Sequence, residues 1–344
     1  MQFGLFGSAT AARHADPDVD SGQGYKQFVD YNIEAEALGY HASFLVEHHF
    51  TGFGQVSASL TLLTWVAAKT KTLRLGTAVL VLPWHNPVLV AEQAATIDLL
   101  SGGRLDFGVG KGYRHNEFAG FCLPIEEADA RFNESLDVIV KAWTSKQRFS
   151  HHGKYWRFED IIVEPPTAQR PHPPMWMAAG SPDSIRQVAA RGFNLLLDQF
   201  ASIEQVGERI AIFKEAVETR GRVFNPMDVG VARAYFVAKD QADKDSALER
   251  RLEAQRRLAA ISNSPDGTKN KASIMAFSDT REASEESALY GTPDEIARKL
   301  EKLRDAGVGY ILLNGGGPAE ESLRRFAREV MPAFVKESRA KVVG

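Results

Sequence analysis

The chain has 344 residues, of which 44% are hydrophobic and 25% are charged, a globular composition that excludes a mainly disordered protein. The net charge of −3 gives no basic field for nucleic acid, and the single cysteine, Cys122, excludes an internal disulfide. No apolar run approaches the roughly 18 residues of a membrane span, so we expect a cytoplasmic protein that binds neither nucleic acid nor membranes.

Eight short apolar runs predict β-strands along the chain. They are continuous apolar runs rather than strict alternations, which is typical of strands buried on both faces. The eight runs cover residues 2–7, 42–49, 73–82, 105–110, 173–180, 193–198, 227–238 and 309–316.

Amphipathic segments follow these runs and predict helices. They cover residues 25–39, 57–70, 87–101, 128–146, 182–191, 203–220, 242–260 and 293–306, with a ninth helix near 320–339. Eight βα units in one domain spanning residues 1–344 predict an α/β fold, the (β/α)₈ TIM barrel. A doubly wound open sheet is the alternative, but it seldom needs eight such units.

Two segments interrupt this rhythm. Residues 147–172 contain aromatic and Pro-rich pieces and predict an insertion, such as a small hairpin, before the fifth strand. Residues 262–290 are polar and Ser-rich, and a long segment of this kind in a compact domain predicts a mobile lid loop.

The active site of a barrel lies at the carboxyl ends of its strands, so the residues that end each strand matter most. The second predicted strand ends in Glu47-His48-His49, and three adjacent titratable groups at this position favour a catalytic role over plain packing. No further zinc ligands end the neighbouring strands, so we expect no metal.

Two other strand ends have features of ligand-binding sites. After the fourth strand, alternate glycines let a ligand approach the backbone, and Lys111 and Arg114 supply positive charge. After the fifth strand, Gly180-Ser181-Pro182 predicts a helix N-terminus, which suits either a phosphate or a plain cap by Ser181.

Several motifs together resemble the bacterial luciferase family of flavin-dependent monooxygenases. They are EHHFTGFG at 47–54, LGTAVLVLPWHNPV at 75–88, LLSGGRLDFGVGKGY at 99–113, GTP at 291–293 and VMPAFVKE at 330–337. The resemblance runs from Met1 to about Ser338. It implies a luciferase-like TIM barrel that binds FMN, as FMNH₂ supplied by a separate flavin reductase. Such an enzyme uses O₂ to oxidise a small organic substrate, for example an aldehyde, and is commonly a homodimer.

The resemblance also assigns catalytic roles. It places His48 at the family's catalytic imidazole, with His49 and Glu47 supporting it and Glu117 as its acidic partner. The reactive cysteine of luciferase is Gly110 here, so we expect no light emission.

The cofactor site follows from the same resemblance. Lys111 and Arg131 stand at the positions of the phosphate-binding cations, and Gly180 replaces an acidic residue of luciferase. The residues matching the rest of the flavin site are Ala78 and Val79, joined by a cis peptide under the ring, Ala179, and the hydroxyl residues Ser181 and Ser184.

Two alternatives stay open. One is a deazaflavin-dependent oxidoreductase of the same fold, against which EHHF followed by Thr51 argues mildly. The other is a non-catalytic flavin-binding partner subunit, against which the paired histidines and the long 262–290 segment argue. The substrate is not identified, and Phe6, Trp84, Phe118 and Phe200 are candidate pocket walls.

Overall fold

The computed structural model describes residues 1–11, 20, 22–263, 275, 277–278, 280–315 and 320–340. Eight parallel strands form a closed ring, because β9 pairs with β10, β10 with β12, and β12 with β1. The strands of the ring are β1 (Gln2–Gly7), β2 (Ala42–Leu45), β3 (Arg74–Thr77), β5 (Leu105–Gly110), β8 (Met175–Ala178), β9 (Asn194–Leu197), β10 (Val229–Val237) and β12 (Tyr310–Asn314). The predicted TIM barrel is confirmed.

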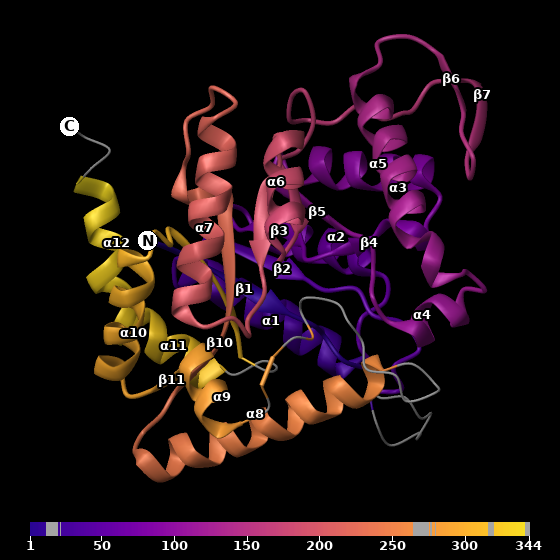
Figure 1. The fold of residues 1–344 in the computed structure, drawn as a ribbon. Coiled ribbons are helices and arrows are strands. Elements are labelled where there is room, and N and C mark those ends of the chain that lie inside the picture. Colours follow the sequence, from indigo (N-terminus) through magenta and orange to yellow (C-terminus); the bar gives the residue numbers. More distant parts are fainter. Residues whose placement is uncertain are drawn as a thin grey trace.

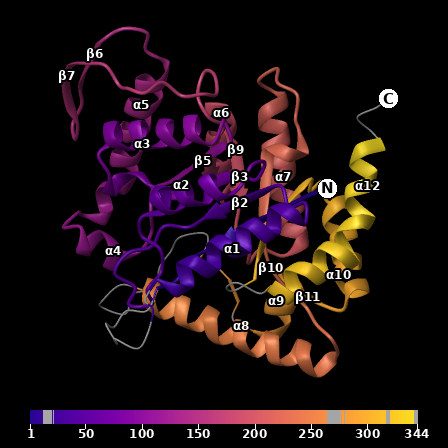
Figure 2. The ribbon, with the colours of Figure 1, turned by 180° about the vertical axis from the view of Figure 1, so that it is seen from behind.

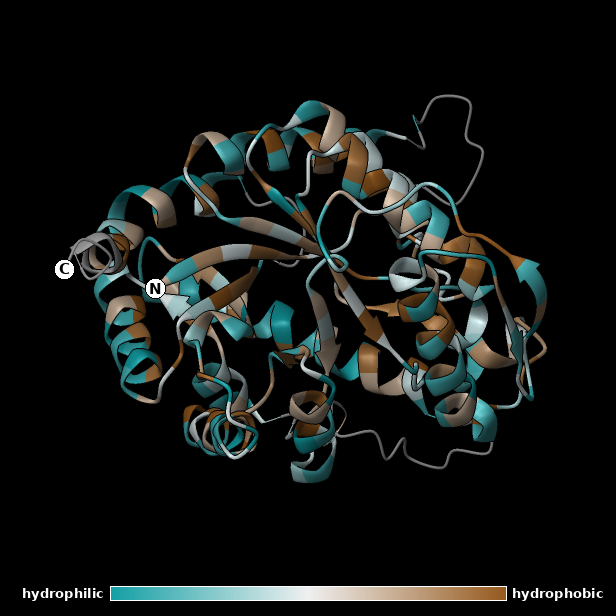
Figure 3. Cartoon of the chain, turned by 90° about the horizontal axis from the view of Figure 1, so that it is seen from above, coloured by the Kyte–Doolittle hydropathy of each residue, from teal (hydrophilic) through white to brown (hydrophobic). Residues whose placement is uncertain are grey.

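Helices surround this ring (Figures 1 and 2), and Figure 3 shows the chain from above, coloured by hydropathy. They are α1 (Gln23–Ala37), α2 (Ser59–Lys69), α3 (Pro87–Leu100), α4 (His115–Gly120), α5 (Ala128–Thr144), α6 (Pro182–Arg191), α7 (Ile203–Glu218), α8 (Gln241–Ser262), α9 (Arg281–Ser287), α10 (Pro293–Asp305), α11 (Glu320–Arg325) and α12 (Met331–Ala340). Short elements are β4 (Leu80–Val81), β11 (Leu289–Gly291), the 3₁₀ turns η1 (Leu82–Trp84), η2 (Ile125–Glu127) and η3 (Pro226–Asp228), and the π-helical turn η5 (Phe326–Val330).

The amino-terminal half of the barrel interior is filled by side chains. Phe44, Trp176 and Tyr310 meet edge to face there, with ring centroids 5.5 to 6.4 Å apart. These rings fit because a neighbouring strand carries a glycine. A Cβ at Gly76 would lie only 2.3 Å from the ring of Phe44, so a larger residue would collide with it. Because this end is packed, ligands have space only toward the carboxyl ends of the strands.

Two predicted strands are shorter than expected. The first, 42–49, ends at Leu45, and the residues after it form the site described below. The second, 73–82, is divided into β3 and β4 by the cis peptide between Ala78 and Val79. Helix α4, which carries Glu117, has no counterpart among the predicted helices.

Both segments that interrupt the βα rhythm contain secondary structure. Residues 147–172 contain the antiparallel hairpin of β6 (Phe149–His152) and β7 (Arg157–Ile161). In the segment predicted as a lid, residues 281–287 form α9 and residues 289–291 form β11, which pairs with β10. Residues 264–274, 276 and 279 of that segment lie outside the described part. Within that part, no helix is both long and apolar enough to cross a membrane.

Candidate active site

Glu47 is a buried carboxylate held between two imidazoles just beyond the end of β2. Its Oε1 accepts hydrogen bonds from Nε2 of His49 at 3.0 Å and from Nε2 of His85 at 2.6 Å, and its Oε2 accepts from the backbone N–H of Val81 at 2.7 Å. Burial alone raises the pKa of a carboxyl group, but these bonds outweigh it and hold the pKa of Glu47 below its usual range. Glu47 is therefore a charged anchor between the ends of β2 and β4.

His48 forms a second imidazole–carboxylate pair with Glu117 of α4. Nδ1 of His48 lies 3.0 Å from Oε1 of Glu117, and the same oxygen accepts the backbone N–H of His49 at 2.9 Å. The Glu117 side chain is buried, whereas 16% of the His48 side chain is exposed. A carboxylate accepts from Nδ1–H, which leaves the lone pair on Nε2 of His48, and no hydrogen bond joins that atom to any described residue.

Burial and three neighbouring groups set the pKa of His48. Burial lowers it most, the hydrogen bond to Glu117 raises it, the positive charge of Arg114 lowers it, and the negative charge of Glu47 raises it slightly. The net result is a pKa below the usual histidine value, so His48 is a neutral base at neutral pH.

Arg114 lies in the turn between β5 and α4 and is 2% exposed. Its Nη1 is 3.7 Å from Oε1 of Glu117, the oxygen that also contacts His48. Its Nε and Nη1 have no hydrogen-bond partner among the described residues, and the indole Nε1 of Trp84 also lacks one. These unsatisfied donors are unusual for a protein interior.

An aromatic cluster packs beside His49. Trp84 stacks on Phe121 with ring centroids 5.4 Å apart, and His49 meets the edge of Trp84 at 5.3 Å. Phe118 is 1% exposed and contacts Trp84 at 5.6 Å, so two of the four candidate pocket walls lie in this cluster. Phe200 lies elsewhere and stacks on Phe277 at 4.4 Å.

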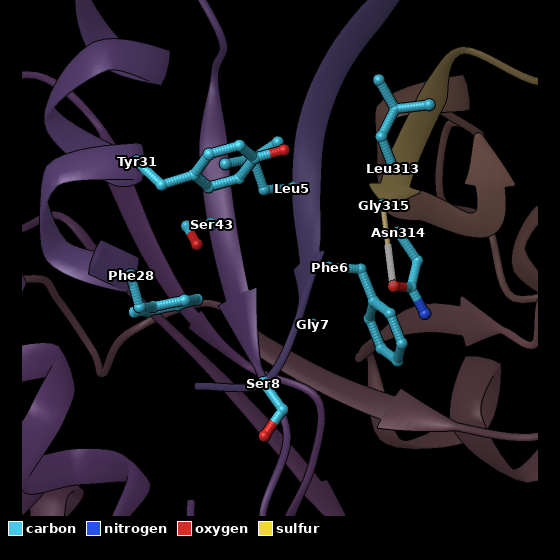
Figure 4. A pocket seen from close by; sticks show the side chains of 10 residues that line it. All are labelled: Leu5, Phe6, Gly7, Ser8, Phe28, Tyr31, Ser43, Leu313, Asn314 and Gly315. Carbon is cyan, nitrogen blue, oxygen red and sulfur yellow. The ribbon is translucent and has the colours of Figure 1, made fainter. Parts of the chain in front are cut away.

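Phe6, the fourth candidate wall, lines a pocket at the carboxyl ends of β1 and β12 (Figure 4). In the figure, Phe6 and Asn314 lie close together, while Phe28 and Tyr31 of α1 line the other side. The pocket is lined by Leu5, Phe6, Gly7, Ser8, Phe28, Tyr31, Ser43, Leu313, Asn314 and Gly315.

The peptide bond between Ala78 and Val79 is cis, as the resemblance implied. A Cβ at Gly110 would lie 2.4 Å from Cγ2 of Val79, so glycine is the residue that fits at position 110. This contact gives a packing reason for the absence of the luciferase cysteine.

The cations expected to bind phosphate are engaged with carboxylates. Nζ of Lys111 lies 2.8 Å from Oδ1 of Asp129, and both side chains are more than half exposed. Arg131 contacts Glu127 at 2.8 Å and lies over the ring of Tyr155, 4.4 Å from its centroid. No described contact joins Lys111 to Arg131. The exposed Lys111–Asp129 pair is weak, so an incoming phosphate can compete with Asp129 for Lys111, whereas the Arg131–Glu127 pair is partly buried.

The start of α6 supplies the expected hydroxyls. Ser181 and Ser184 form a reciprocal capping box at this exposed helix end, and their hydroxyl oxygens are 2.9 Å apart. Val109 of β5 is in register with Met177 of β8, so Lys111 and Ala179 follow at the same level of adjacent strands. The hydroxyls of this helix end and the cation at the same barrel edge are groups that bind phosphate, so these residues fit a phosphorylated flavin, which would compete with the capping box for the two hydroxyls.

The structure adds His85 to the predicted site residues, because it completes the Glu47 network from a turn that the sequence presents as a helix entry. The sequence indicates Arg114 only as a positive charge after the fourth strand, and it has no local signal for the burial of that side chain. Among the described residues, no group of three His, Cys, Asp or Glu side chains is arranged to hold a metal ion.

The imidazole–carboxylate contacts of Glu47 and Glu117 lie just beyond the carboxyl ends of the barrel strands, where enzymes of this fold have their active sites. A family model described as luciferase-like monooxygenase matches residues 1–309, and the chain belongs to this family. The predicted family is confirmed.

Named relatives extend over most of the chain. The oxygenase component of a flavin-dependent trigonelline monooxygenase from Acinetobacter baylyi is 28% identical, over 92% of each chain. An FMNH₂-dependent dimethylsulfone monooxygenase from Pseudomonas putida is also 28% identical, over 88% of this chain and 87% of that one. An F420-dependent glucose-6-phosphate dehydrogenase from Amycolatopsis mediterranei is 26% identical, over 90% and 94%.

A solved structure agrees with this assignment. The monooxygenase RslO1 from Streptomyces bottropensis superposes with a TM-score of 0.82 at 26% identity, covering 97% of this chain and all of that chain. The chain is therefore an oxidoreductase of the luciferase-like family, and its cofactor is a flavin or a deazaflavin.

Proposed function

We propose that this protein is the oxygenase component of a two-component monooxygenase, which takes FMNH₂ from a separate flavin reductase and uses O₂ to oxidise a small organic substrate. The observation that carries the proposal is the His48–Glu117 pair, a neutral imidazole with a free Nε2 at the barrel mouth. Two relatives with flavin or FMNH₂ in their names support the choice of flavin.

Each residue of the site has a definite task in this proposal. Lys111, Arg131, Ser181 and Ser184 hold the phosphate, Ala179 and Gly180 border it, and Ala78–Val79 supports the ring. Reduced flavin supplies the electrons that activate O₂. His48 accepts or returns a proton at Nε2, and Glu117 keeps its Nδ1 protonated and its ring oriented. Glu47 and His49 fix the segment that carries His48.

The direct test is turnover by purified protein with FMNH₂, O₂ and a panel of aldehydes, ketones, sulfonates and carboxylates. Formation of an oxygenated product in step with flavin oxidation supports the proposal. Release of hydrogen peroxide alone with every compound would contradict it.

A deazaflavin-dependent oxidoreductase is the second candidate, because an F420-dependent dehydrogenase matches 90% of the chain. Equilibrium titration of the protein with FMN and with F420 separates the two. Tighter binding of F420, with hydride transfer under anaerobic conditions, would replace the monooxygenase proposal.

We also propose a homodimer formed through α2 and α3. These neighbouring helices expose Trp65, Leu89 and Leu100, with 59%, 55% and 68% of each residue accessible. Large exposed apolar side chains on two adjacent helices are typical of an association surface.

A further inference from the structure

Arg114 carries a charge and donors that the acid–base pair does not use. The residue is 2% exposed, and its Nε and Nη1 have no hydrogen-bond partner among the described residues. The 3.7 Å separation between Nη1 and Oε1 of Glu117 is an ionic contact, too long for a hydrogen bond. A buried donor without an acceptor is unfavourable, so this arrangement favours a ligand that supplies one.

The position of the guanidinium group shows where that ligand would bind. Oε1 of Glu117 contacts both Nη1 of Arg114 and Nδ1 of His48, so the guanidinium and the imidazole are arranged around one oxygen. The ring of Tyr113 lies against the guanidinium, with 5.5 Å between Cζ and the ring centroid. An acceptor bound to Arg114 therefore lies close to the imidazole that handles the proton.

We propose that Arg114 binds a carboxylate group of the substrate, and that this enzyme acts on small organic carboxylates. The inference rests on the proposed function, because it places the anionic end of the substrate beside the reacting site. Arginine cannot lose its charge when buried, and hydrogen bonds between charged partners are about twice as strong as neutral ones. Glu117 already accepts two hydrogen bonds from other donors, and the guanidinium also has a hydrogen bond with the Tyr113 side chain. A carboxylate would therefore be the first acceptor for Nε and Nη1, which have none among the described residues.

Isothermal titration with benzoate and acetate, and with the neutral amides benzamide and acetamide, tests this assignment. We expect each carboxylate to bind at least about tenfold more tightly than its amide, since a charged hydrogen bond contributes roughly 1.5–3 kcal/mol. Arg114→Met should abolish that preference while changing the affinity for FMN by no more than about twofold. Arg157→Met, at an exposed arginine of the hairpin, is the matched control and should leave every affinity unchanged.

A second variant guards against misfolding. Arg114→Met leaves the buried charge of Glu117 without its cation, whereas Arg114→Met combined with Glu117→Gln removes both charges together. Circular dichroism checks the fold of each protein, and the double variant should also bind benzoate and benzamide equally.

Three results would overturn the inference: no preference for the carboxylate in the wild type, a preference that survives Arg114→Met, or no binding of either carboxylate. Loss of FMN affinity in Arg114→Met with carboxylate binding intact would instead make Arg114 a flavin ligand. A protein that binds benzoate through Arg114, yet oxidises nothing with FMNH₂, would contradict the proposed function and not this inference.

Discussion

His48 has the features of a general base at neutral pH. Its Nδ1 is bonded to Glu117, its pKa is lowered mainly by burial, and part of its ring is open to a ligand. A positioned acid–base group of this kind typically contributes about 10²–10⁴-fold to a rate.

Replacing His48 tests that role. We expect His48→Ala to keep its fold and most of its FMN affinity, to lose about 10²–10⁴-fold in coupled substrate oxidation, and to release hydrogen peroxide instead. Glu117→Gln should show a smaller defect of the same kind, because it disturbs the orientation of the base and leaves the base present. Product and peroxide are measured in the same reaction. If His48→Ala oxidises substrate at the wild-type rate and releases no more peroxide than the wild type, His48 only lines the pocket and has no acid–base role.

The pH dependence follows from the same pKa. A base with a lowered pKa stays neutral over a wider range, so kcat/KM should fall only when the pH drops below about 6.5, the ordinary histidine value. Glu117 raises the pKa of His48, so Glu117→Gln should move this acidic limb to still lower pH. The measurement is kcat/KM as a function of pH for the wild type and for Glu117→Gln. A fall in activity that begins at a higher pH in the variant would contradict the hydrogen bond between Glu117 and His48.

At the scale of elements, the ends of the strands were harder to predict than the strands themselves. Apolar runs located all eight strands of the ring, because burial on both faces leaves a strong local pattern. The run 42–49 was too long because Glu47 leaves the sheet to bond His85 and Val81, partners about 35 residues away. Helix α4 was missed because its six residues are too few for a helical period. The burial of the Arg114 side chain arises only when the chain is folded, and it leaves no local pattern in the sequence.

The close packing of β3 against β5 leads to a stability prediction. A Cβ at Gly108 would lie 1.8 Å from the carbonyl oxygen of Thr77, whereas a Cβ at Gly7 meets no atom within 4 Å. Gly108→Ala should therefore destabilise the protein by about 1–3 kcal/mol or more, and Gly7→Ala should change the free energy of unfolding little. Urea denaturation of both variants measures the difference, and equal midpoints would show that the strands can separate to accept the methyl group.

The start of α6 and the cations near α5 lead to a binding prediction. FMN should bind far more tightly than riboflavin, and Lys111→Met or Arg131→Met should each weaken FMN binding about tenfold without affecting riboflavin. Asp129→Asn, which frees Lys111 from its ion pair, is the complementary variant and should not weaken FMN binding. Equal affinities for FMN and riboflavin in the wild type would contradict the proposal that these residues bind the flavin phosphate.

At the scale of the whole molecule, the apolar face of α2 and α3 determines the expected assembly. We expect a dimer of twice 37.9 kDa in sedimentation equilibrium. Trp65→Glu combined with Leu100→Glu should give a monomer, since burying two carboxylates in an apolar interface is strongly unfavourable. Val223→Glu, at an exposed apolar residue after α7, is the control and should leave the dimer intact. A wild-type monomer would contradict the homodimer proposal.

The packed aromatic layer of Phe44, Trp176 and Tyr310 also has a kinetic consequence. Since these described side chains close one end of the barrel, flavin and substrate pass through the same opening, and the ligand bound deeper cannot leave while the outer one is in place. Binding should therefore be ordered: the ligand that binds deeper enters first and leaves last. A non-reactive analogue of the outer ligand should slow the dissociation of the inner one in stopped-flow displacement, rather than merely compete with it.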